Sequence, residues 1–168
     1  MNLYGYAGGD PINNHDPFGL DVVFKNDEDN VMANSWAHAK RTLRRSAREG
    51  DADAQTALMA MRRMENDQER TYTFENVSRE RGLGTAQGTT ATIAVGAIGV
   101  AREYDRLLVN VASTLVHEAG HLYYENGPGA FNPTSYWSQA WALSFDNAYR
   151  RSVKMLEREN HNSYPRRP

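Results

Sequence analysis

The pattern H-E-x-x-H occurs in the second half of the chain, at His117-Glu118-Ala119-Gly120-His121. On a helix, histidines four residues apart lie on one face, one turn from each other, and two such imidazoles can bind one zinc ion. At 100° per residue, Glu118 lies within about 100° of both histidines, so its carboxylate can take a proton from a water molecule beside the metal. The pattern therefore predicts a Zn2+ site with His117 and His121 as ligands and Glu118 as the catalytic base.

A zinc site of this kind needs a third protein ligand, and an acidic residue on a following helix is one source. Asp146 lies in a segment that is apolar nearly all round, so its carboxylate is expected to be buried and to need a partner. Zinc is one such partner, and Arg150, four residues further on, is another. Asp146 is therefore the expected third metal ligand, and Glu125, Glu157 and His161 are further candidates for that position.

The residues around the motif have the apolar spacing of a helix. The apolar positions are Leu107, Val111, Leu115 and Leu122. They predict a helix that begins at about residue 103 or 105 and ends near residue 124. Glycine inside a helix costs about 1 kcal/mol relative to alanine, so the small pair Ala119-Gly120 needs a reason. The pair would let another element approach this helix closely.

The remaining elements follow from the same kinds of pattern. Helices are predicted from residue 30 or 34 to 50, from residue 51 or 53 onward, and from 134 to about 157. Strands are predicted at 21–24, 71–77 and 89–98, loops at 81–88 and 126–133, and a frayed tail from 160 to 168. These elements predict an α+β fold with a small mixed or antiparallel sheet. The strand at 89–98 directly precedes the motif helix, so it is the expected edge for an extended substrate.

Composition excludes several classes of protein. The 168 residues are enough for about one domain, and 40% hydrophobic with 24% charged residues is typical of a globular chain. A net charge of −2 gives no electrostatic signature for nucleic acid, and the absence of cysteine excludes disulfides and thiolate metal sites. The longest weakly polar stretch, 91–101, is too short to span a membrane, and the N-terminus lacks the pattern of a signal peptide.

The first twenty residues are rich in Gly, Pro, Asn and Asp, and they carry a specific motif. Residues 2–20 resemble the end of the RHS-repeat-associated core, which closes with N-L-Y-x-Y-x-x-x-x-P and then D-P-x-G-L. The matching positions of the second part are Asp16, Pro17, Gly19 and Leu20. In that family a β-cage encloses a variable C-terminal toxin and is cut just after D-P-x-G-L. The resemblance implies that Asp16 belongs to an aspartyl self-cleavage site.

The same resemblance implies that residues 1–20 are the end of the RHS core and that the chain after residue 20 is the released toxin. Within it, the toxin domain is expected at 21–160 and a flexible tail at 161–168. The implied partners are the RHS cage with its secretion apparatus and a cognate immunity protein. The implied location is outside the producing cell, reached through a specialised secretion system, with action in the cytoplasm of the target cell.

Residues from about 54 to 154 are similar to the zincin metallopeptidase toxins that occur in such cassettes. The similarity rests on Leu115-Val-His-Glu-Ala-Gly-His121 and on the pair Asp146-Asn147 followed by Arg150. It implies a zincin-like fold and zinc-dependent cleavage of a protein in the target cell. Two different functions are also compatible with these residues. One is a toxin that binds its target and uses a metal only to hold its fold, and the second is an amidase acting on a non-protein substrate such as peptidoglycan.

Overall fold

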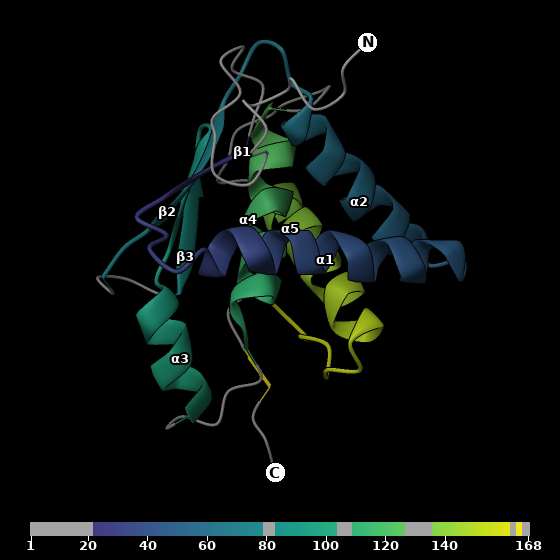
Figure 1. Cartoon of the computed structure of the whole chain (residues 1–168). Coiled ribbons are helices and arrows are strands. Elements are labelled where there is room, and N and C mark those ends of the chain that lie inside the picture. The colour runs from purple at the N-terminus through teal and green to yellow at the C-terminus, as the bar shows by residue number, and fades with distance from the viewer. Residues whose placement is uncertain (1–21, 79–82, 104–108, 127–135, 162–163, 166–168) are drawn as a thin grey trace, which may run out of the picture.

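The computed structural model of the chain describes residues 22–78, 83–103, 109–126, 136–161 and 164–165 (Figure 1). The elements within these ranges are β1 (Val22–Lys25), α1 (Val31–Arg48), α2 (Ala52–Glu65), β2 (Tyr72–Asn76), β3 (Gly84–Gln87), β4 (Thr90–Ile93), α3 (Val95–Glu103), α4 (Val111–Asn126) and α5 (Tyr136–Ser152). Helices and a mixed sheet confirm the predicted α+β class. The RHS-like motif at 1–20 and most of the predicted loop at 126–133 lie outside the described residues.

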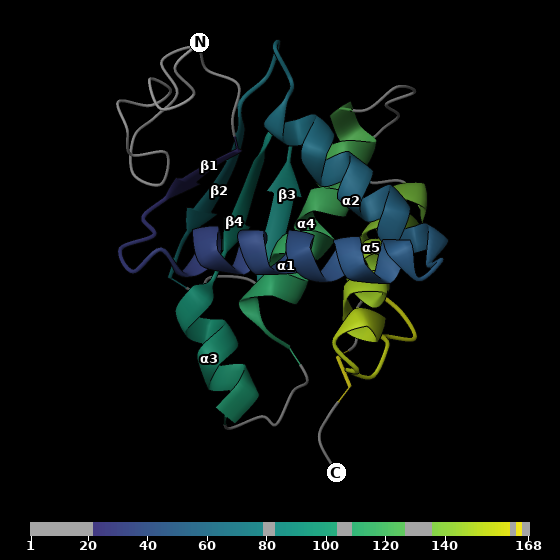
Figure 2. The same ribbon diagram turned by 45° about the vertical axis from the view of Figure 1, so that its right-hand side comes forward.

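The four described strands form one sheet in the order β1-β2-β4-β3. β1 and β4 both run parallel to β2, whereas β3 runs antiparallel to β4. Parallel neighbours need a crossover connection, and the α1–α2 hairpin provides the one between β1 and β2. Figures 1 and 2 show α1 lying across α4 and α5, with the sheet beside them. In the described sheet β3 is therefore an edge strand, and it contacts α4.

Three aromatic rings join the sheet to α1. Phe24 on β1 is in register with Phe74 on β2, and their ring centroids are 5.8 Å apart. Trp36 on α1 lies 5.1 Å from Phe74 and 6.1 Å from Phe24. Its indole N–H donates to Glu65 at 2.8 Å, so the ring is buried without leaving its polar group unpaired. This cluster fixes α1 against the parallel half of the sheet.

The two helices predicted in the first half of the chain are confirmed as α1 and α2. The carboxylate of Asp27 accepts the backbone N–H groups of Met32 and Ala33, each at 2.9 Å, and so caps the start of α1. Gly50, with φ of 100°, makes the tight joint, and the side chain of Asp51 caps α2 by accepting from Ala54. Short-range capping therefore determines where each helix begins.

The glycines of segment 81–88 predict a loop, but residues 84–87 form β3. Gln87 pairs with Thr90, which leaves a two-residue turn with Gly88 in its first position at φ of 61°. A two-residue hairpin turn requires a positive φ there, and glycine adopts it without steric cost. The glycines that suggest a loop are thus compatible with an antiparallel hairpin, because one of them forms its turn.

The strand predicted at 89–98 is less than half as long as expected, because β4 runs from Thr90 to Ile93 and α3 begins at Val95. The side-chain oxygen of Asn76 accepts the N–H of Val95 at 3.3 Å, which supports the first turn of the helix. β4 also lies between β2 and β3. The predicted position of the substrate edge on 89–98 is therefore wrong, and the described edge next to α4 is β3.

The motif helix and the last helix are both shorter than predicted. Asn110 accepts the N–H of Ser113 at 2.7 Å and caps α4, so this helix begins at Val111. α5 ends at Ser152 because Lys154 has a positive φ of 58° and the N–H of Met155 returns to the carbonyl of Arg150 at 2.8 Å. The chain after α5 is therefore released from the helix and can turn back toward α4.

α4 and α5 approach each other closely at Gly120. A Cβ atom added at Gly120 would lie 2.6 Å from the Cα of Ala142 and 3.0 Å from its backbone nitrogen. This confirms the expected reason for a glycine in the middle of the motif helix. Among the described helices, none is both long enough and apolar enough to cross a membrane.

We expect Gly120→Ala to lower the free energy of unfolding by about 2 kcal/mol, because the new methyl group would push apart two packed backbones. Gly99→Ala on α3 is the matched control, since nothing lies within 4 Å of a Cβ built there. That variant should gain up to about 1 kcal/mol from helix propensity alone. Urea unfolding of both variants and the parent chain measures the difference. Equal stability of the two variants would contradict the close contact.

Candidate metal centre

Three histidine side chains meet at one point of the molecule. α4 carries His117 and His121 one turn apart, and His161 comes from the chain that follows α5. The Nε2 atom of His161 lies 3.1 Å from that of His117 and 3.0 Å from that of His121. Three ring nitrogens thus converge on a common point, which is the arrangement that a bound cation requires.

The donor set fits a metal ion in both number and spacing. Nitrogen ligands in a tetrahedral zinc site, at bond lengths of about 2.0–2.1 Å, lie roughly 3.3 Å from one another. The two Nε2 separations of 3.0 and 3.1 Å are close to that value. His117, His121 and His161 could therefore hold a metal ion. Three protein ligands leave room for a fourth, non-protein ligand, as catalytic sites do.

Burial keeps two of the imidazoles neutral. It lowers the pKa of His121 to about 4 and holds the pKa of His117 well below its ordinary value, and the positive charge of Arg158 acts in the same direction on both. A neutral imidazole offers a nitrogen lone pair, which is the form that coordinates metals. The protein environment thus favours the ligand form of both α4 histidines.

The outer nitrogens of the rings have partners of their own. Nδ1 of His121 lies 2.8 Å from the hydroxyl of Ser138, a fully buried residue of α5. Nδ1 of His117 lies 3.3 Å from the guanidinium of Arg158 and 4.0 Å from the carboxylate of Asp146. The hydroxyl of Ser138 can accept the Nδ1–H of His121, which leaves Nε2 free to bind a metal. Arginine only donates, so the acceptor that faces an Nδ1–H of His117 is the carboxylate of Asp146.

The prediction that Asp146 is the third ligand disagrees with this arrangement. Asp146 is 1% exposed, as expected, but its two oxygens accept from arginines: Oδ1 from Arg150 at 2.8 Å and Oδ2 from Arg158 at 3.1 Å. A carboxylate with two guanidinium partners is already neutralised and has no need of a cation. Asp146 therefore lies behind His117, while His161 is the residue whose ring nitrogen meets those of the two α4 histidines.

Glu125 and Glu157, the two glutamates that the sequence offers as third ligands, have partners away from the histidines. Glu125 accepts the backbone N–H of Gly88 at 2.9 Å, at the hairpin turn. Glu157 pairs with Arg151 at 2.9 Å on the surface. His161 falls at the start of the predicted flexible tail, yet its ring lies next to both α4 histidines, tilted to His117 with centroids 4.8 Å apart and edge-on to His121 with centroids 5.1 Å apart.

Glu118 is buried beside the edge strand. Its side chain is 4% exposed, and a Cβ atom added at Gly84 of β3 would lie 2.6 Å from its Oε1. Burial raises the pKa of Glu118 to about 8, with the charge of Arg158 opposing that shift. A divalent cation near the carboxyl favours its ionised form, which is the form that acts as a base. The glycine at position 84 is what allows the carboxyl and the strand to lie so close.

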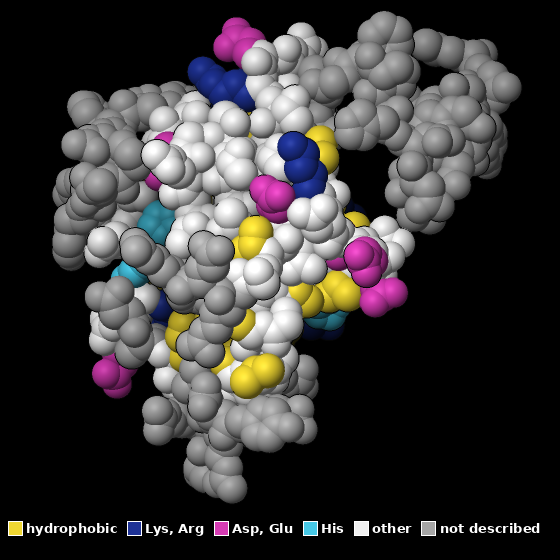
Figure 3. Space-filling view, turned by 90° about the vertical axis from the view of Figure 1, so that its left-hand side faces the viewer, with side chains coloured by type: hydrophobic (Ala, Val, Ile, Leu, Met, Phe, Trp, Pro, Cys, Tyr) yellow, Lys and Arg dark blue, Asp and Glu magenta, His cyan; other side chains and the backbone are white. Residues whose placement is uncertain are grey.

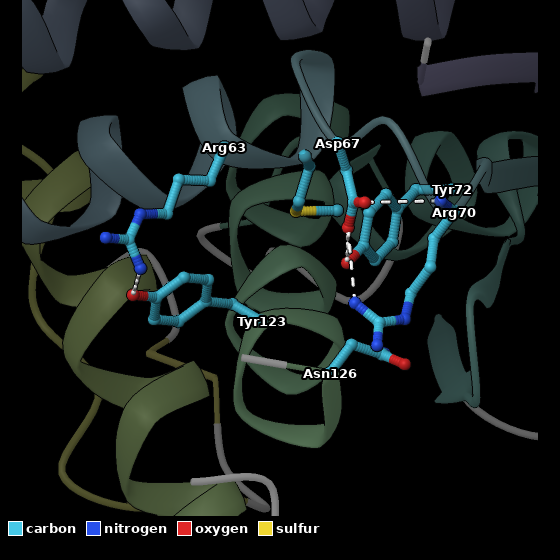
Figure 4. Close-up of a pocket in the computed structure, with 7 residues that line it drawn as sticks. Arg63, Asp67, Arg70, Tyr72, Tyr123 and Asn126 are labelled. Atoms are coloured by element: carbon cyan, nitrogen blue, oxygen red, sulfur yellow. Dashed lines mark hydrogen bonds and ion pairs between the residues drawn. The ribbon is translucent and has the colours of Figure 1, made fainter. Parts of the chain in front are cut away.

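A pocket of about 410 Å3 lies elsewhere, between the end of α2, the start of β2 and the end of α4 (Figure 4). Its charged groups are paired within its own wall: Arg70 with Asp67 at 3.5 Å, and Arg63 with the hydroxyl of Tyr123 at 3.4 Å. None of the three histidines lines it. On the face drawn in Figure 3, acidic and basic side chains are scattered, and the described part of that face has no broad basic patch. The group of side chains suited to chemistry is therefore the histidine cluster with Glu118.

No protein-family model, curated protein or solved structure matches this chain. The geometry and chemistry of the site are therefore the basis for inferring a function. Reasoning from sequence finds His117, Glu118 and His121, and it names His161 as a further candidate ligand. It misses Ser138 and Arg158, because neither has a fixed spacing to the motif that would identify it.

His161→Ala is expected to weaken Zn2+ binding by on the order of 100-fold, since losing a ligand costs at least as much as losing an outer contact. Competition titration against a chromophoric chelator, on the full chain, measures the affinity. His38→Ala is the control, because His38 is an exposed histidine on α1 whose ring lies 6.3 Å from that of Tyr149. Its affinity should equal that of the parent. A His161→Ala variant that binds Zn2+ as tightly as the parent would refute the three-histidine site.

Proposed function

We propose that this chain is a metal-dependent hydrolase of the zincin type and that its substrate is a peptide bond in a target-cell protein. One observation carries the proposal: α4 presents two histidines and a buried glutamate, a third histidine completes the donor set, and an edge strand passes over the glutamate. Zinc is the metal that suits this set of neutral imidazoles best among the common divalent ions.

His117, His121 and His161 would hold the ion. When bound, zinc supplies a Lewis acid that polarises a carbonyl and makes water a stronger acid. Glu118 would take the proton of the attacking water and pass it to the leaving amine. Its buried position between α4 and β3 keeps the carboxyl shielded from bulk solvent and directed to one place.

The edge strand supports a peptide as the substrate. β3 pairs with β4 on one side, and in the described sheet its other side has no partner strand. An extended peptide can add to such an edge through its backbone groups. Gly84 lies on this strand next to Glu118, so a peptide paired there would pass close to the proposed base.

The proposal includes delivery as a toxin. The RHS-like motif at residues 2–20 supports an origin as the C-terminal cargo of an RHS cage, secreted by a specialised system and active in the target cytoplasm. A producing cell would then need an immunity protein against the released domain. Delivery is inferred from the sequence motif alone, since the motif lies outside the described residues.

We expect Glu118→Gln to lower the rate of hydrolysis by at least about 100-fold while Zn2+ affinity stays within a few-fold of the parent, because a general base contributes about 10²–10⁴ to the rate. The variant and the parent would each be expressed in a bacterial cytoplasm. Growth of the cells is recorded, and new protein N-termini are identified by mass spectrometry. Glu125→Gln is the control on the same helix, since the carboxylate of Glu125 accepts from the backbone N–H of Gly88 at the hairpin turn.

The outcomes separate the candidate functions. Toxicity that persists in Glu118→Gln without new N-termini would support a binding module with a structural metal. Released muropeptides in place of new N-termini would support an amidase. Unchanged proteolysis in Glu118→Gln would refute the proposed mechanism.

Gly84→Ala tests the contact between the edge strand and the base. Its methyl group would meet Oε1 of Glu118 at 2.6 Å and Cγ2 of Thr114 at 3.0 Å, so the carboxyl must move. We expect a loss of activity of about tenfold or more with unchanged Zn2+ affinity, since small displacements of a catalytic group cost up to about 10²-fold. Gln87→Ala, at an exposed position of the same strand, should retain activity. Full activity in Gly84→Ala would contradict the assigned place of Glu118.

A further inference from the structure

The third ligand comes from the least regular part of the described site. His161 lies nine residues beyond the end of α5, in a segment without helix or strand. Ligands on helices are held by the backbone ladder, whereas a ligand on an irregular segment needs other contacts to fix it. Contacts outside the backbone ladder must therefore place His161 opposite the two histidines of α4.

Two sets of hydrogen bonds fasten the segment to α5. The side-chain amide of Asn147 pairs with the backbone of Arg158 in both directions: it accepts its N–H at 2.8 Å and donates to its carbonyl at 2.9 Å. Arg150 donates to the carbonyl of Leu156 at 3.1 Å. These bonds fix residues 156–158 but do not reach His161 itself.

The guanidinium of Arg158 extends this anchoring to the ligand. Its Nη2 donates to the backbone carbonyl of His161, while its Nη1 donates to Asp146 at 3.1 Å and lies 3.3 Å from Nδ1 of His117. The ring of Tyr164 covers the guanidinium, with its centroid 4.0 Å from Cζ. Arg158 is 4% exposed, so these contacts are made out of water. Arg158 thus contacts His161 from the segment, His117 from α4 and the buried Asp146 from α5.

We propose that Arg158 is a positioning residue that, held by Asp146, places His161 as the third metal ligand; this rests on the proposed metal site. Arginine suits the role because its planar fork can donate to a carboxylate and a carbonyl at the same time. A lysine could neutralise Asp146, but a single ammonium on a flexible stem does not reproduce the fork. Asp146 then serves the metal centre indirectly, through the arginine and not through coordination.

The test is a double-mutant cycle on Zn2+ affinity in the full chain, with Arg158→Met, His161→Ala and the combined variant. We expect Arg158→Met to weaken binding by about 10–100-fold, as outer contacts of metal ligands commonly do. In the His161→Ala background the same change should have an effect of less than about threefold, because the ligand that Arg158 positions is already gone. The d–d absorption of bound Co2+ should show the same loss of one nitrogen ligand in both single variants.

Arg158→Lys separates a loss of positioning from a loss of folding, because it leaves a cation beside Asp146. It should melt like the parent in circular dichroism and still lose affinity as Arg158→Met does. Arg151→Met is the control, because this partly exposed arginine also contacts the segment, through Glu157. The Zn2+ affinity of this variant should stay within about threefold of the parent.

The failures are distinguishable. Full affinity in Arg158→Lys and Arg158→Met, or equal effects of Arg158→Met in the parent and His161→Ala backgrounds, would overturn the positioning role while leaving the metal site intact. A parent chain that binds no Zn2+, or one that binds it equally well without His161, would instead overturn the proposed function.

Discussion

The buried carboxylate of Asp146 connects the parts of this structure that must meet for the site to exist. Taking an ionised carboxylate out of water costs several kcal/mol, and Asp146 at 1% exposure can stay ionised only with close partners. It has two, Arg150 from its own helix and Arg158 from the segment beyond it. Removing either partner would leave a buried charge insufficiently compensated. The segment that carries His161 is therefore tied to α5 by an interaction that is costly to break.

The position of α5 depends in turn on Gly120. Because α4 has no side chain there, the backbone of Ala142 can lie against it. That close approach brings the hydroxyl of Ser138 within 2.8 Å of His121 and places Asp146 behind His117. The glycine at position 120 thus sets how close α5 lies to α4. It thereby sets the distances from Ser138 to His121 and from Asp146 to His117. The H-E-x-x-H motif thus contains both the proposed metal ligands and the glycine that lets α5 lie close to them.

The elements that depend on local signals are predictable from the sequence. The apolar stripes of α1 and α2 and the helical placement of His117, Glu118 and His121 follow from spacing along a helix. The pairing of residues 84–87 with 90–93 is not, because glycines suggest a loop whether they interrupt a strand or form the turn of a hairpin, as Gly88 does. The burial of Asp146 is predictable as well, but its choice between a metal and arginines is decided by Arg158. That residue is twelve positions away and reaches Asp146 only because the chain turns back after α5.

The donor set has an electrostatic consequence for the proposed chemistry. Three neutral imidazoles would leave the charge of a bound divalent cation undiminished, whereas a carboxylate ligand would cancel one unit of it. The two arginines compensate Asp146, and Glu118 is the second buried carboxyl of the described site. A cation with its full charge beside a buried carboxyl favours both the loss of its proton and the anionic tetrahedral state of a reacting carbonyl. Because Asp146 pairs with arginines and is not among the proposed ligands, a bound cation would keep its full charge. Both electrostatic effects would then be stronger than with a carboxylate ligand.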